Sequence, residues 1–146
     1  MLLVRSGRAE NIVGLLDTAG SWCQIDLGEH RRMLPNRYSL QHGWSNGNFR
    51  SQHWRLEARN EESEGWTALR THGDGAYATG DASGMDAARS IPNGAYGVGC
   101  WPVKEQEGLG FRYLRVLMTG LDSYGTNFLC CSVLEFWGTL TDTTPA

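Results

Sequence analysis

The sequence predicts an all-β protein, an antiparallel β-sandwich with little helix. Short segments in which apolar and polar residues alternate recur along the chain, as in strands with one buried face. Glycine, asparagine and aspartate separate these segments, while the 3.6-residue periodicity of amphipathic helices is hard to find. Seven or more short strands at this spacing are typical of a sandwich, and a closed barrel is the alternative.

The expected strands span residues 21–27, 37–42, 53–59, 66–71, 99–103, 111–118 and 129–140. Alternation is clearest in 53–59, where Trp54, Leu56 and Ala58 share one face and four polar side chains share the other. Such a strand has one side on a core and the other in water.

Two further segments indicate which side chains face inward. In 111–118, Leu114, Val116 and Met118 point one way and Arg115 the other. In 21–27, the smaller apolar residues Cys23, Ile25 and Leu27 form the expected inward set, opposite Trp22, Gln24 and Asp26.

The connections between strands are polar. Residues 43–48 and 60–65 are glycine-bearing loops, and Glu61, Glu62 and Glu64 form a charged hairpin tip. Residues 73–96 are rich in glycine, alanine and aspartate, and a loop of this length is usually functional or disordered. Its acidic residues lack the alternating oxygen ligands of a calcium loop, so we expect a solvated loop there, with acids at Asp74, Asp81 and Asp86.

Composition limits the function classes. A chain of 146 residues fits one domain, residues 1–146, and its 13 basic against 16 acidic residues give a net charge of −3. We expect neither a nucleic acid nor a membrane as partner, because both require a basic face. No apolar run has the length of a signal peptide or a membrane span, so the expected location is the cytoplasm or nucleus.

The cysteines favour free thiols over a disulfide framework. No C-x-x-C spacing occurs, and no histidine pair has metal-ligand spacing, so we predict no metal and no cofactor. The four are Cys23, Cys100, Cys130 and Cys131.

Several motifs follow one another in a fixed order. They are S-W-C-Q-I-D-L-G at 21–28, L-P-N-R-Y-S-L-Q-H-G at 34–43, W-R-L-E at 54–57, W-T-A-L at 66–69, C-W-P at 100–102, F-R-Y-L-R-V at 111–116, T-G at 119–120 and L-E-F-W-G-T at 134–139. This order resembles the discoidin-like (galactose-binding-like) β-sandwich domain of giant HECT-type ubiquitin ligases, with relatives in BTB-domain proteins. It is most similar to the domain of HECTD-type ligases described as SUN-like.

The resemblance covers residues 8–140 and implies a jelly-roll sandwich that recognises partners through loops at one end. Three departures accompany it. The first strand of the family is expected to be missing before residues 6–13, Gln41 stands where the family usually has arginine, and the 73–96 loop is longer than the usual hairpin.

The tryptophans have two interpretations, core packing or a platform on which sugars stack. Five lie in or beside expected strands and are assigned to packing: Trp22, Trp54, Trp66, Trp101 and Trp137. Trp44 lies in a polar loop, where partner binding and packing both remain open.

A polar, mildly cationic end of the sandwich is the predicted partner-binding patch. It comprises Gln41, His42, Trp44, Asn46, Arg50 and His72. For His42 a structural role, tying the strand end to the Gly43 turn, is preferred over ligand contact.

Ser39, His42 and Asp26 do not predict a hydrolase, because no nucleophile elbow occurs. The expected function is therefore a non-catalytic protein-recognition module of a large intracellular assembly, in a ubiquitin-ligase context. The alternatives are a carbohydrate-binding module or a purely structural subunit of a large complex.

Overall fold

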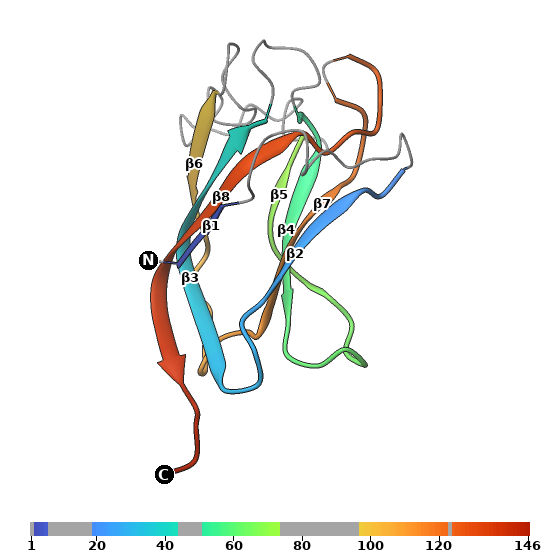
Figure 1. Cartoon of the computed structure of the whole chain (residues 1–146). Helices are drawn as coiled ribbons and strands as arrows, with labels where there is room; N and C mark the ends of the chain where they lie inside the picture. The colour runs from blue at the N-terminus through green and yellow to red at the C-terminus, as the bar shows by residue number, and fades with distance from the viewer. Residues whose placement is uncertain (1, 6–18, 44–50, 74–96, 123) are drawn as a thin grey trace.

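The protein is a two-layer β-sandwich (Figure 1). The computed structural model describes residues 2–5, 19–43, 51–73, 97–122 and 124–146, and these hold eight strands and no helix. The strands form two separate four-stranded sheets in which every pairing is antiparallel. The predicted antiparallel sandwich is confirmed, and the barrel alternative is wrong because the two sheets have separate strand orders.

Each sheet combines strands that are distant in sequence. The first sheet has the order β1-β8-β3-β6, with β1 at Leu2–Arg5, β8 at Cys131–Asp142, β3 at Arg31–His42 and β6 at Val98–Pro102. The second sheet has the order β2-β7-β4-β5, with β2 at Trp22–Asp26, β7 at Tyr113–Met118, β4 at Trp54–Arg59 and β5 at Thr67–His72.

All seven expected strands are present, most with ends within two residues of the prediction. The exception is β3, which begins at Arg31 rather than at residue 37. The pairing of β3 with β8 shifts register between Pro35 and Arg37, and such an irregularity accommodates a proline that cannot donate to the ladder. The short strand β1 was not expected.

The core lies between the sheets, and it contains the inward-facing side chains that the alternation of apolar and polar residues predicts. Trp54, Leu56 and Ala58 of β4 are fully buried, as are Leu114 and Val116 of β7. On β2 the inward set is confirmed, because Ile25 is buried while Cys23 and Leu27 pack against the core.

The tryptophans divide into two groups. Trp54 and Trp101 are fully buried in the core. Trp22 is 56% exposed, so its assignment to packing is wrong. Its place in the alternation of β2 decides this, because neighbouring strand residues point to opposite faces. Trp66 and Trp137 are half-buried, each beneath at least one arginine side chain.

The four cysteines are free thiols; Cys23 is half-buried, Cys100 exposed, and Cys130 and Cys131 are buried. The hairpin tip at residues 60–65 is largely exposed, as expected. The acidic residues Asp74, Asp81 and Asp86 lie outside the described residues. Within the described ranges, no helix has the length and hydrophobicity to span a membrane.

Candidate functional site

The predicted loop-end patch is described only in part. Trp44, Asn46 and Arg50 lie outside the described residues. Gln41 is half-buried, whereas His42 is fully buried and His72 is only 2% exposed. The structure therefore places both imidazoles in the interior rather than on a solvent-facing patch. His72 pairs with Trp54 across the β4–β5 hairpin, and this register turns its side chain toward the core.

His72 belongs to a buried aromatic cluster. Its ring stacks on Trp54 at a centroid distance of 4.1 Å and an interplanar angle of 9°, and meets Trp101 edge-on at 4.8 Å. The Tyr38 hydroxyl accepts a hydrogen bond from Trp54 Nε1 at 2.9 Å and lies 2.5 Å from His72 Nε2. Which of the two groups donates in this contact depends on the His72 tautomer.

Burial fixes the protonation states in this cluster. Desolvation, assisted by the positive charge of Arg70, lowers the pKa of His72 to about 3, so the ring is neutral at pH 7. Burial also raises the pKa of Tyr38, which keeps its hydroxyl protonated. The cluster therefore links the two sheets as a structural unit.

The residues of the hydrolase hypothesis do not converge. The Ser39 hydroxyl donates to Glu135 at 3.2 Å within the first sheet. Asp26 lies on the second sheet and accepts from Arg112 Nε at 2.7 Å and Nη2 at 2.9 Å. His42 is buried.

A concave surface lies on the first sheet, and we call it the groove. It has a volume of about 340 Å³ and is lined by Leu34, Pro35, Asn36, Val103, Glu105, Gln106 and Thr139. This volume falls within the range of small-molecule sites, roughly 300–1,000 Å³. The lining combines apolar side chains with two amides, one hydroxyl and one carboxylate.

The irregularity at Pro35 shapes the groove. The backbone carbonyl of Asn36 accepts from the Val103 amide at 2.9 Å, which holds the segment after β6 against β3. Across the strand pair, Gly138 faces Pro35 with φ of 151°, and a Cβ at this position would lie 1.9 Å from the Leu34 carbonyl oxygen. The backbones can approach this closely only because residue 138 is glycine.

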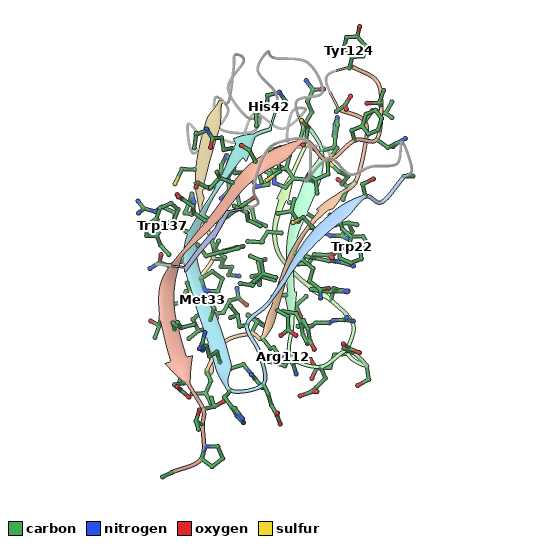
Figure 2. All side chains as sticks on the ribbon, in the orientation of Figure 1. Trp22, Met33, His42, Arg112, Tyr124 and Trp137 are labelled. Atoms are coloured by element: carbon green, nitrogen blue, oxygen red, sulfur yellow. The ribbon has the colours of Figure 1, made fainter. Side chains whose placement is uncertain are left out.

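An aromatic side chain lies on the strand that supplies Thr139 to the groove. Trp137 is two residues before Thr139 on β8, so the two share a face of the sheet. Figure 2 shows Trp137 projecting away from the sandwich. The Arg37 guanidinium lies 4.5 Å from the centre of the Trp137 ring, and Arg37 adjoins Asn36 of the groove. This pairing orients the indole.

The groove was not foreseen from the sequence. The signals present were a proline directly after two apolar residues and a glycine near the end of the last strand, at Pro35 and Gly138. Their meaning depends on the pairing of β3 with β8, which joins residues about a hundred positions apart.

The outer face of the second sheet forms another distinctive surface, which we call the arginine–aromatic face. It comprises Trp22, Gln24, Asp26, Arg55, Glu57, Arg59, Trp66, Arg112, Tyr113, Arg115 and Leu117. The Arg115 and Arg59 guanidiniums lie 4.0 and 4.3 Å from the Trp66 ring centre. The alternation in residues 53–59 predicts that the charged side chains of β4 lie on this outer face. Their partners on the neighbouring strand follow from the register of β4 and β7.

Among the described residues, no group of three or more histidine, cysteine, aspartate or glutamate side chains is arranged to hold a metal ion.

Comparisons with known proteins support the fold. No protein-family model matches the chain, and the search of curated proteins finds no significant relative. Among solved structures, the chain is similar to the C-terminal domain of a chitobiase from Bacteroides fragilis, with a TM-score of 0.53 and 16% sequence identity. The match covers 86% of this chain and 67% of that one. At this identity the similarity shows the fold alone, and it is consistent with a galactose-binding-like sandwich at a coarse level.

Proposed function

We propose that this chain is a non-catalytic carbohydrate-binding module that holds a neutral sugar in the groove. The observation that carries the proposal is the groove itself, a concavity with neutral amide and hydroxyl groups on the same sheet face as Trp137. Amides and hydroxyls complement sugar hydroxyls by hydrogen bonding, while an indole offers a flat apolar surface to the carbon-bound hydrogens of a sugar ring.

The polar groups of the groove come from three segments. Asn36 comes from β3, Thr139 from β8, and Gln106 from the segment after β6. The side-chain amide of Gln106 donates to the Lys104 carbonyl at 2.9 Å, which limits its rotation and so lowers the entropic cost of binding.

The groove supports binding rather than hydrolysis. Glycosidases generally use two carboxyl groups flanking the scissile bond. Among the described residues that line the groove, Glu105 is the single carboxylate. The enzyme that contains the similar domain is named a chitobiase, and chitin sugars are therefore among the ligands chosen for the test.

Binding is tested by titration calorimetry with chitobiose, longer chitin oligosaccharides and other neutral oligosaccharides, with and without calcium. Trp137→Ala is expected to weaken binding about tenfold, or about 1.4 kcal/mol. Thr67→Ala, an exposed position on the second sheet, is the matched control and should bind like the wild type. No binding by the wild type, or equal binding by the two variants, would contradict the proposal.

A protein-recognition module is the second candidate, the function that the HECT and BTB resemblance implies. The arginine–aromatic face favours it, because tryptophan, tyrosine and arginine are enriched at the centres of protein interfaces. A place in a ubiquitin-ligase assembly stays a prediction. Co-purification of a ubiquitin-ligase subunit with the wild-type chain, and its loss in Trp22→Ala, would favour this candidate over the first.

A further inference from the structure

Part of the arginine–aromatic face lies around Trp22. The β2–β7–β4 register places Trp22, Leu117 and Arg55 in one row across three strands. The next row contains Gln24, Arg115 and Glu57. Trp22 is 56% exposed, so this surface presents one large aromatic ring on the same sheet face as the two arginines.

The two guanidiniums share one carboxylate. Glu57 is 2% exposed, and its two oxygens accept from Arg55 Nε and Arg115 Nε, each at 2.6 Å. The shared carboxylate neutralises one positive charge and leaves one in excess. The Arg55 side chain is 37% exposed and that of Arg115 is 18% exposed, so this charge faces the surface.

The other end of the face carries no excess positive charge. Arg112 pairs with Asp26 through two hydrogen bonds. Arg59 donates to the backbone carbonyls of Glu62 and Glu64, whose hairpin supplies further negative charge. The excess positive charge is therefore concentrated at Arg55 and Arg115, in a chain whose net charge is −3.

We propose that Trp22, Arg55 and Arg115 form a second binding site, for an acidic polysaccharide. A sugar ring stacks on Trp22, and its carboxylate or sulfate group, or that of the next sugar, pairs with the two guanidiniums. The inference rests on the proposed function only in taking the ligand to be a carbohydrate.

The spacing suits such a ligand. Neighbouring strands lie about 4.8 Å apart, so the backbone of Arg55 is about 10 Å from that of Trp22 along the row, and the backbone of Arg115 lies on the intervening strand about 7–8 Å away on the diagonal. Glu57 holds both guanidiniums by their Nε atoms, which reduces the entropy lost when an anion binds. An exposed ring and two guanidiniums spread over three strands match an extended polymer with repeated acidic groups.

The test is affinity electrophoresis of the wild-type chain in gels containing polygalacturonate, heparin or dextran. These polymers supply carboxylated, sulfated and neutral sugars. We expect retardation by at least one of the two acidic polymers, decreasing as salt is raised, and none by dextran. Trp22→Ala should weaken retardation about tenfold.

A second variant removes the charged group as a unit. The triple substitution R55Q/E57Q/R115Q avoids leaving Glu57 buried without a partner and lowers the net charge by one. Arg31→Gln, an exposed position on β3, makes the same change in net charge and is the control. The control should migrate like the wild type, while the triple variant loses retardation.

The outcomes separate this site from the groove. Trp137→Ala should leave retardation by acidic polymers unchanged, while Trp22→Ala should leave binding of neutral oligosaccharides unchanged. Failure of both acidic polymers to retard the wild type, equal retardation by dextran, or equal loss in the Arg31→Gln control would overturn the proposal. Binding of an acidic protein at Trp22, with no retardation of the chain by any polysaccharide, would also overturn the proposal.

Discussion

The buried His72 predicts a specific dependence of stability on pH. Its pKa is about 3 in the folded chain, against about 6.5 in an unfolded chain. Below pH 6.5 the unfolded chain takes up a proton that the folded chain does not. The free energy of unfolding therefore falls as the pH decreases from 6.5 toward 3.

The magnitude follows from the difference in proton uptake. At pH 5 an unfolded imidazole is almost fully protonated while folded His72 is neutral, which lowers stability by about 2 kcal/mol relative to pH 7. The ring is only 2% exposed, so solvent screening of this effect is small. Asp26 and Asp142, whose pKa values are lowered by hydrogen bonds, reduce stability mainly below pH 4, outside this window.

The assay is urea unfolding at pH 7 and pH 5, followed by tryptophan fluorescence. In His72→Phe the phenyl ring can still stack on Trp54, but residue 72 no longer binds a proton. At pH 7 it should be about 1–3 kcal/mol less stable, because the buried Tyr38 hydroxyl loses its hydrogen bond with His72. Between pH 7 and pH 5 it should lose about 2 kcal/mol less than the wild type. His30→Gln, at an exposed histidine, is the control and should retain most of the pH dependence. Equal pH dependence in the wild type and His72→Phe would refute the reasoning.

Two further predictions concern stability. Glu57→Gln should destabilise the fold by about 1–2 kcal/mol in urea unfolding, less than for a fully buried ion pair because both arginines are partly exposed. Glu107→Gln, an exposed position, is the control, and equal stability of the two variants would show that Glu57 contributes nothing. Gly138→Ala should cost about 1–3 kcal/mol, because its methyl group would meet the Leu34 carbonyl. Gly65→Ala, where a Cβ would have no neighbour within 4 Å, should be close to neutral, and thermal melting of the two variants is the measurement.

The strands were largely predictable because their signal is local. Alternation in 53–59 and 111–118 reports directly on one buried and one solvated face, and the structure buries Trp54, Leu56, Leu114 and Val116 as the pattern indicates. The early start of β3 was missed because Pro35 interrupts the pattern, and only the pairing with β8 accommodates it.

Individual aromatic and polar residues were harder to place. A tryptophan within an expected strand favours packing at Trp22, although the alternation of that strand places it outside. His72 was placed in a surface patch, whereas its register opposite Trp54 turns it inward. Residue type alone cannot distinguish these cases, because indole and imidazole rings are found in both environments.

The sequence by itself determined the all-β class, the positions of seven strands and most of the core, since these depend on neighbours along the chain. Only the tertiary structure decided the two surfaces proposed to bind ligands. The groove joins Asn36, Gln106 and Thr139, and the second site joins Trp22, Arg55 and Arg115. Both sets are assembled by strand register between distant segments, and register depends on cross-strand packing that no local pattern records.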